Sequence, residues 1–176
     1  EDYLNVSEKD LSSIDEHIVF NKMKDLSQEY YVAMRRFLIE HPLISSLEKK
    51  EFLLSHENDG NCCEIIRDAY EPIPADSYVC PNCGWTLSLS GQQPVCCHRD
   101  CEQRYFTSRE EVKPVGFQYE YRLKKGVMRY ISYPGRAEIE IKDICDQLAL
   151  KSELWPEHDR YDIKIIFSNG TCWGID

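Results

Sequence analysis

Apolar and polar residues alternate along the C-terminal stretch from Tyr161 to Asp176. Its odd-numbered positions include the apolar residues Ile163, Ile165, Phe167, Trp173 and Ile175. The even-numbered set contains the charged residues Asp162, Lys164 and Asp176. A period of two is typical of strands with one packed face and one polar face. The stretch therefore predicts a half-buried β-hairpin.

The turn of this hairpin determines which residues lie opposite each other. The sequence Ser-Asn-Gly at 168–170 suits a three-residue loop closed by a left-handed glycine, so that Phe167 pairs with Thr171. Counting outward from this turn places Asp162 opposite Asp176. A two-residue Asn-Gly turn would put the two aspartates on opposite faces, but it would also oppose the two apolar rows.

Two opposed carboxylates are an unusual pair for a hairpin. Directly opposed side chains have Cβ atoms about 5 Å apart, where like charges destabilise the pair. Such a pair is usually tolerated because a cation lies between the carboxylates, and an all-oxygen pair suits Mg²⁺ or Mn²⁺. Asp162 and Asp176 are therefore candidate ligands of a divalent ion. The alternative is that both are solvated on an exposed strand face.

A helical period governs the first part of the chain. Apolar residues recur at helical spacing at Tyr30, Met34, Phe37 and Leu38, and Pro42 ends this segment. A second helix is expected from Ser45 or Ser46 through Leu54. The region carries most of the acidic excess, so we interpret it as a solvated helical surface that packs on a neighbour and has no catalytic role.

A further helix is expected after Pro134-Gly135. Its predicted buried stripe consists of Ile141, Ile144, Cys145 and Leu148, and Glu138 lies one turn earlier on the same face. An acid on that face is either an edge residue that reaches water or a partner of the hairpin aspartates. Glu140 is the alternative to Glu138. A short strand around Leu154 and Trp155 then leads to the hairpin.

Composition and charge narrow the function classes. The chain has 176 residues, of which 42% are hydrophobic, so it can form one domain or two small ones. A formal net charge of -10 argues against general polyanion binding, so any nucleic-acid contact must come from a local basic face. Nine cysteines without a hydrophobic leader indicate a reducing compartment, and we expect a cytoplasmic protein with no membrane partner.

The segment from Cys80 to Cys101 carries the most specific motif. Cys80-x-x-Cys83-Gly84 has the spacing of a zinc knuckle, and Cys97 and Cys101 are the predicted third and fourth ligands. Cys96 or His98 could replace Cys97. Four thiolates leave no open position on the ion, so the expected Zn²⁺ is structural and holds a short polar segment together.

Basic and aromatic residues alternate between Tyr121 and Arg136, without an acid among them. The candidate nucleic-acid contacts are Arg122, Lys124, Lys125, Arg129 and Arg136. Their expected role is to bind phosphates, with the neighbouring tyrosines available for sugar or base packing. The alternative is a solvated hairpin around Lys125-Gly126.

The order of these C-terminal elements resembles the first half of the PD-(D/E)XK nuclease core. In that superfamily an acid on a leading helix, an acid on the second strand and a D/E-x-K on the third surround divalent metal. The resemblance maps Glu138, Asp162 and Asp176 to these acids, with Asp159 in reserve for the second-strand acid. The superfamily's lysine would stand two residues after Asp176, so we expect the chain to be a piece of a longer polypeptide and inactive alone.

More narrowly, a helical front, a zinc ribbon and the stretch from Tyr121 to Asp176 are similar to the restriction-endonuclease-type protein encoded beside prokaryotic PIWI-like proteins and helicases. The resemblance implies an α+β chain. We expect a helical domain at 1–76, a Cys₄ zinc ribbon at 77–108, and at 109–176 the helix, strand and hairpin of a restriction-endonuclease-like α/β/α core.

The function implied is a metal-dependent DNA endonuclease subunit of an anti-invader defence system. Its expected cofactors are structural Zn²⁺ and catalytic Mg²⁺ or Mn²⁺. The expected partners are DNA or an RNA–DNA hybrid, a PIWI-like protein and a helicase. Two alternatives remain: a non-catalytic zinc-ribbon adaptor, or a protein-interaction module with a nuclease-like scaffold.

Overall fold

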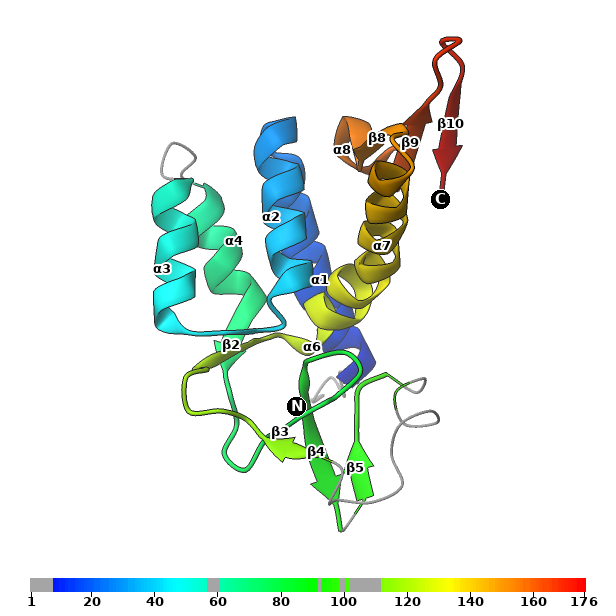
Figure 1. Cartoon of the computed structure of the whole chain (residues 1–176). Coiled ribbons are helices and arrows are strands. Elements are labelled where there is room, and N and C mark those ends of the chain that lie inside the picture. Colours follow the sequence, from blue (N-terminus) through cyan, green and yellow to red (C-terminus); the bar gives the residue numbers. More distant parts are fainter. Residues whose placement is uncertain (1–7, 57–60, 92, 99–100, 102–111) are drawn as a thin grey trace.

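A computed structural model describes residues 8–56, 61–91, 93–98, 101 and 112–176 (Figure 1). Helices occupy the middle of the molecule, a small β-ribbon lies at one end, and a β-hairpin projects near the opposite end. The two candidate sites lie at these two ends. The chain is mixed α+β with N-terminal helices, as predicted.

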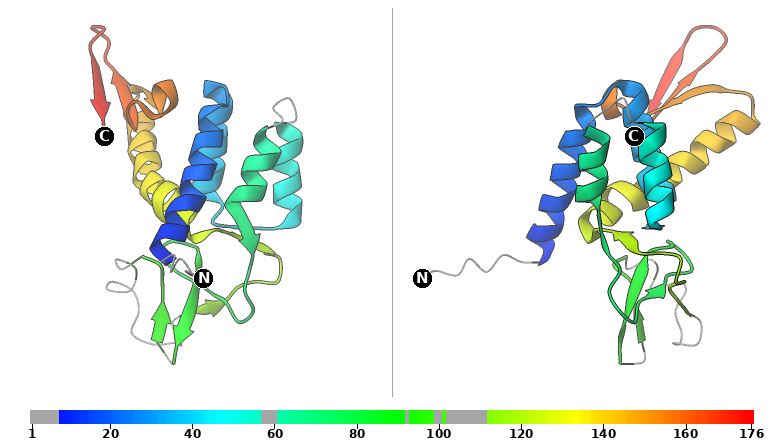
Figure 2. Two further views of the ribbon diagram at one scale, coloured as in Figure 1. Left: turned by 180° about the vertical axis from the view of Figure 1, so that it is seen from behind. Right: turned by 90° about the vertical axis from the view of Figure 1, so that its left-hand side faces the viewer.

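Four helices form the N-terminal part: α1 (Glu8–Lys24), α2 (Gln28–Glu40), α3 (Ser46–Ser55) and α4 (Asn61–Ala69). The predicted end of α2 before Pro42 is confirmed. Helix α3 begins with a capping box, in which the Glu48 amide donates to Ser45 Oγ and the Ser45 amide donates to Glu48 Oε2. Helix α1 packs against α4 (Figure 2).

Within the described ranges, ten short strands form three sheets. One sheet has the order β1-β7-β2, from Leu43–Ile44, Tyr121–Leu123 and Tyr70–Pro72. The β-ribbon has the order β5-β4-β3-β6, from Gln93–Val95, Thr86–Ser90, Tyr78–Val79 and Lys113–Pro114. The third has the order β10-β9-β8, from Cys172–Ile175, Ile163–Ile166 and Lys151–Leu154.

The first sheet joins parts of the chain that are far apart in sequence. Strand β7 lies between β1 and β2, so residues from 109–176 share a sheet with residues from 1–76. The three-domain division stays a prediction, and its boundary between 108 and 109 lies outside the described residues. None of the helices in the described ranges is long and apolar enough to span a membrane.

A continuous helical segment replaces the expected helix start at Pro134. It comprises α6 (Lys125–Val127), a turn of π-helix (Met128–Ser132) and α7 (Tyr133–Gln147). A proline inside a helix has no amide to donate and its ring clashes with a carbonyl one turn earlier, which explains a widened turn before Pro134. The possible hairpin around Lys125-Gly126 is therefore wrong.

The predicted buried stripe of α7 is partly wrong. Cys145 is buried, but Ile144 and Leu148 are 53% and 65% exposed. Glu138 lies on the buried face together with Cys145, as predicted, and Gly135 is buried there as well. Helix α7 contacts α2 at this point, where a Cβ on Gly135 would lie 2.3 Å from Ile39 Cδ1. A larger residue at position 135 would therefore require the Ile39 side chain to move.

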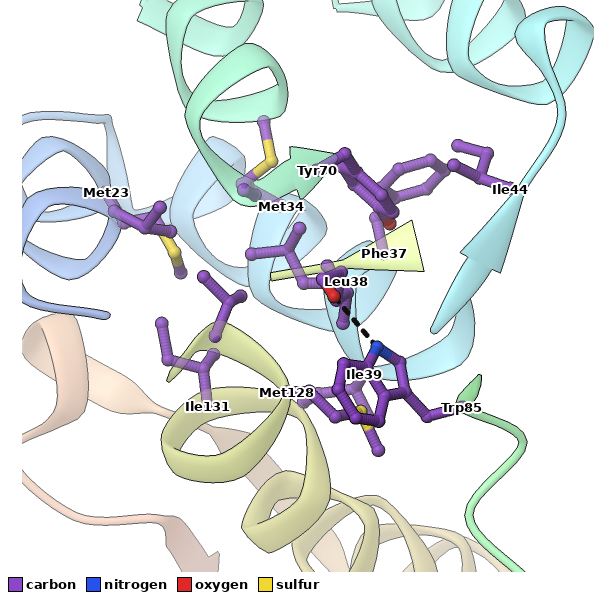
Figure 3. Packing of buried hydrophobic residues seen from close by; sticks show 14 of the residues in the cluster. Met23, Met34, Phe37, Leu38, Ile39, Ile44, Tyr70, Trp85, Met128 and Ile131 are labelled. Atoms are coloured by element: carbon purple, nitrogen blue, oxygen red, sulfur yellow. Dashed lines mark hydrogen bonds between the residues drawn. The ribbon is translucent and has the colours of Figure 1, made fainter. Parts of the chain in front are cut away.

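The main core lies between α1, α2, α4 and the segment 125–132. Met23, Met34, Leu38 and Met128 are fully buried there (Figure 3). Trp85, from the loop before β4, reaches the same cluster, and its Nε1 donates to the Leu123 carbonyl at 2.8 Å. The β-ribbon is therefore anchored to the helical core by one buried indole.

Candidate functional site

Four cysteine sulfurs meet at the base of the β-ribbon. The Sγ atoms of Cys80, Cys83, Cys96 and Cys101 all lie within 4.8 Å of one another, and all four residues are buried. The Cys83 and Cys96 sulfurs are 3.7 Å apart. Tetrahedral Zn²⁺ with Zn–S bonds of about 2.3 Å requires sulfurs about 3.8 Å apart, so the arrangement fits this ion. The assignment to Zn²⁺ rests on the four cysteine sulfurs, since the structure includes no ion.

Local backbone geometry builds the knuckle. The Gly84 amide donates to the Cys80 carbonyl at 2.9 Å, and Gly84 has a φ of +74°. This left-handed turn lets Cys80 and Cys83 present their sulfurs to one point. On the other side, Asn82 Nδ2 donates to Cys101 Sγ at 3.1 Å. The knuckle predicted from the Cys-x-x-Cys-Gly spacing is thus present.

The fourth sulfur is Cys96, where the sequence analysis favoured Cys97. Cys96 is buried and its sulfur converges with those of the knuckle, whereas Cys97 is half-buried and lies outside the group. His98, the other alternative, stacks on Tyr133 with ring centroids 3.7 Å apart.

The pKa values of Cys83, Cys96 and Cys101 depend on the neighbouring thiols. The pKa of Cys96 is lowered, first by a hydrogen bond from Cys80 and then by one from Cys83. The pKa of Cys83 is raised, first because of its hydrogen bond with Cys80. Burial raises the pKa of Cys101. Sulfurs packed this closely cannot all carry charge without a cation, which is the condition that a bound Zn²⁺ satisfies.

The hairpin has the register that the turn chemistry predicted. The Phe167 amide donates to the Thr171 carbonyl at 2.9 Å, and Gly170 has a φ of +83°. Ile163, the first residue of β9, pairs with Ile175, the last residue of β10. Asp162 precedes β9 and Asp176 follows β10, so extending the register by one residue places them at the open end of the hairpin.

Glu138 lies inside the molecule and is held by two donors. Arg35 Nη2 donates to its Oε2 at 3.0 Å and to its Oε1 at 3.3 Å, and Trp155 Nε1 donates to Oε2. The same guanidinium pairs with Asp159 through Nη1. Arg35 comes from α2, where the sequence analysis expected no role at this site. Glu140, the alternative to Glu138, is exposed on the outer side of α7.

Burial and like charges act on two of these acids. The pKa of Glu138 is raised by burial, although the charge of Arg35 and the hydrogen bond from Trp155 oppose the shift. Burial also raises the pKa of Asp162; the charge of Arg35 opposes this shift, and the charges of Asp159 and Asp176 add to it. The neighbouring carboxylates are thus close enough to affect one another electrostatically.

The acids do not form one compact group. Within the described part of the chain, the only set of three or more potential ligands that converges on a point is the cysteine cluster. Glu138 and Asp159 are joined through Arg35, whereas Asp162 and Asp176 meet at the hairpin end. The structure therefore divides the predicted acids into a pair held by a guanidinium and a pair related by strand register.

Comparison with protein families gives a match in the C-terminal segment. Residues 135–176 match the family model described as REase associating with pPIWI_RE. The match begins in α7 and contains Glu138, Asp162 and Asp176, while the four cysteines lie outside it. Comparisons with curated proteins and with solved structures give no match. The family resemblance predicted from the sequence is confirmed for the segment that carries the acids.

The basic residues between Tyr121 and Arg136 are less exposed than predicted. Arg122 Nη2 lies 2.7 Å from Glu71 Oε1, and its guanidinium stacks on Trp85. Lys124 Nζ donates to Asp15 at 3.1 Å. These two cations hold the fold together, so Lys125, Arg129 and Arg136 are the remaining candidates for phosphate contacts. DNA binding by any of the five stays a prediction.

Asp162→Asn in the REase segment is expected to raise the melting temperature at neutral pH without divalent ions. The folded-state pKa of Asp162 is raised above 3.8, so the folded chain loses stability as pH rises and this carboxyl ionises. The gain should shrink as pH falls and should vanish below 3.8, where both the folded and the unfolded chain hold the proton. Thermal denaturation at several pH values measures this, with the exposed Asp143→Asn as the control. An unchanged melting temperature at neutral pH would contradict the expected repulsion.

Proposed function

We propose that this protein is the metal-dependent endonuclease subunit of a prokaryotic defence system, acting on DNA or an RNA–DNA hybrid with a PIWI-like protein and a helicase as partners. The observation that supports the proposal is the pairing of Ile163 with Ile175 within a segment that matches a restriction-endonuclease family. Extending this register by one residue would place Asp162 opposite Asp176, although nothing in the hairpin itself requires two acids there.

The chemistry of the pair fits a hard divalent cation. Both donors are carboxylate oxygens, which Mg²⁺ and Mn²⁺ prefer. The pKa of Asp162 is raised by burial and by its neighbours, so ionising it beside Asp176 is unfavourable until positive charge is added. A bound ion would supply an activated water molecule and neutralise charge that develops on the scissile phosphate.

The chain's own residues orient this pair. The Trp155 amide donates to the Asp162 carbonyl at 2.9 Å, which fixes the backbone at the start of β9. Trp155 also holds Glu138 through Nε1. Glu138 contributes negative charge beside the aspartates, and it accepts hydrogen bonds from Arg35 at both oxygens and from Trp155 at Oε2.

The zinc-binding role of the cysteine cluster is structural in this proposal. The β-ribbon and the hairpin lie at opposite ends of the molecule (Figure 1), so the cluster cannot reach the aspartates. It braces the segment that carries Trp85 and, through it, the sheet around β7. This also leaves its outer surface available for a partner protein.

Cleavage of nucleic acid tests the proposal. The full-length protein, alone and with its partners, is incubated with supercoiled plasmid, single strands or an RNA–DNA hybrid in Mg²⁺ or Mn²⁺. We expect cutting that chelation stops and that falls more than about a hundredfold in Asp162→Ala and Asp176→Ala, since even outer-shell partners of a metal cost 10–100-fold.

The matched control is Asp143→Ala, which removes an exposed carboxylate from α7 in the same segment. It should cut like the wild type. Cutting that persists in the Asp162 and Asp176 variants would place the site elsewhere. No cutting on any substrate, with the partners present and the zinc site loaded, would favour the non-catalytic adaptor.

A further inference from the structure

We infer that Arg35 of α2 is a positioning residue of the proposed nuclease site, and that its guanidinium occupies the place beside Glu138 and Asp159 that a second cation would otherwise take. The inference rests on the proposed function. It implies that the site takes one divalent ion, held by Asp162 and Asp176. It also makes the N-terminal helices part of the site.

Arg35 is buried and contacts only groups that fix it. Its side chain is 7% exposed, and its partners Glu138 and Asp159 are 11% and 19% exposed. The guanidinium also lies 4.6 Å from the centre of the Trp155 ring and donates to Tyr31 Oη at 3.2 Å. The two carboxylates and the two aromatic rings together hold the buried guanidinium in one position.

The helix contact that brings Arg35 to Glu138 is built into the sequence. Gly135 allows α7 to touch α2 at Ile39. Residues three or four apart lie on the same face of a helix, so Arg35 is one turn from Ile39 and Glu138 is one turn from Gly135. The close approach at the glycine therefore places the guanidinium against the carboxylate.

The loop before Asp162 is held by the same helix. Gln28 Nε2 donates to the Trp155 carbonyl at 2.8 Å, and the His158 amide donates to Gln28 Oε1 at 2.9 Å. Trp155, Glu157, His158 and Asp159 all have positive φ, between 45° and 76°. Such conformations are unfavourable for residues other than glycine and persist only where the surroundings impose them. Hydrogen bonds from α2 hold the loop in these conformations, which place Asp159 beside Arg35.

Charge explains why Arg35 limits the number of ions. Glu138 and Asp159 together carry two negative charges, and the guanidinium neutralises part of that charge while contacting both Glu138 oxygens. A divalent ion at the same place would lie within a few ångströms of a fixed positive charge, which is strongly unfavourable in a buried site. Asp162 and Asp176 form no ion pair with Arg35 that the described structure shows, although the charge of Arg35 lowers the pKa of Asp162.

The test counts Mn²⁺ ions bound by the full-length protein after its cysteine site has been saturated with Zn²⁺, using electron paramagnetic resonance of free Mn²⁺. We expect one Mn²⁺ per chain in the wild type and two in Arg35→Gln. The second ion should be lost again in Arg35→Gln combined with Glu138→Gln. Arg35→Lys retains the charge and should bind one.

The control is Arg36→Gln, at the neighbouring position, where the side chain is 46% exposed and pairs with Glu40. It should bind one ion. Two Mn²⁺ ions per chain in the wild type would overturn the inference, as would one Mn²⁺ per chain in a folded Arg35→Gln. If Arg35→Gln does not fold, the numbers of Mn²⁺ ions bound by the wild type and by Arg35→Lys decide. No bound ion, or one that persists unchanged in Asp162→Ala, would instead overturn the proposed metal site.

Discussion

Cys96→Ser is expected to lose the structural zinc and to unfold the β-ribbon, while Cys97→Ser keeps both. The two cysteines are neighbours, but only the Cys96 sulfur converges with those of Cys80, Cys83 and Cys101. Binding of structural Zn²⁺ contributes about 10–16 kcal/mol to folding in zinc-finger peptides. A serine hydroxyl is a poor replacement for a thiolate ligand, so much of that free energy is lost.

Zinc content of the purified variants measures this effect directly. Elemental analysis should give about one Zn²⁺ per chain for the wild type and Cys97→Ser, and much less for Cys96→Ser. Trp85 is 4% exposed and provides a second readout, because its fluorescence should shift when the ribbon detaches from the core. Equal zinc content in Cys96→Ser and Cys97→Ser would mean that the fourth ligand has been assigned wrongly.

Trp155→Ala is expected to lower the free energy of unfolding by about 3–5 kcal/mol, the usual cost of truncating a buried aromatic residue. Trp155 is fully buried and packs its ring against the Arg35 guanidinium. Its removal leaves a cavity and takes a donor from the buried Glu138. Since folded domains are stable by only about 5–15 kcal/mol, this single change affects a large share of the total.

Denaturant unfolding of the zinc-loaded protein measures the loss. The matched control is Trp173→Ala on β10, whose side chain is 64% exposed and should cost less than about 0.5 kcal/mol. Trp155→Phe separates packing from hydrogen bonding, because it keeps most of the volume and loses the indole donor. Similar losses in Trp155→Ala and Trp173→Ala would contradict the placement of Trp155 at the centre of the acidic network.

The hairpin could be predicted from sequence because its determinants are local. Three consecutive residues, Ser-Asn-Gly at 168–170, fix the turn, and the turn fixes the register of every pair beyond it. The opposition of Asp162 and Asp176 followed from counting. The knuckle at Cys80 and Cys83 was equally local, since spacing and one glycine determine it.

The errors concern choices that only packing decides. Cys96 and Cys97 are equivalent in spacing, and only the three-dimensional position of the sulfurs selects Cys96. The face of α7 that carries Glu138 and Cys145 was predicted, but Ile144 and Leu148 are exposed. Helical spacing does not show whether a neighbouring element covers the edge of that face.

Arg35 could not have been found from the sequence as a site residue. It lies in an ordinary amphipathic helix, 103 positions before Glu138, and its neighbour Arg36 is a similar arginine with a surface role. A possible signal was the unusual acid on the inner face of α7, because a buried carboxylate requires a partner. The sequence alone does not show which of the chain's cations that partner is.

Glu138 and Asp159 are expected to bind Arg35, whereas Asp162 and Asp176 are expected to bind the metal ion. Crystals of the zinc-loaded protein soaked in Mn²⁺ distinguish these two pairs of acids. An anomalous difference map at the manganese absorption edge should show one peak, between the carboxylates of Asp162 and Asp176, with Arg35 still on Glu138 and Asp159. A peak between Glu138 and Asp159 with Arg35 displaced would contradict the account, as would a fully soaked crystal with no peak at the aspartate pair.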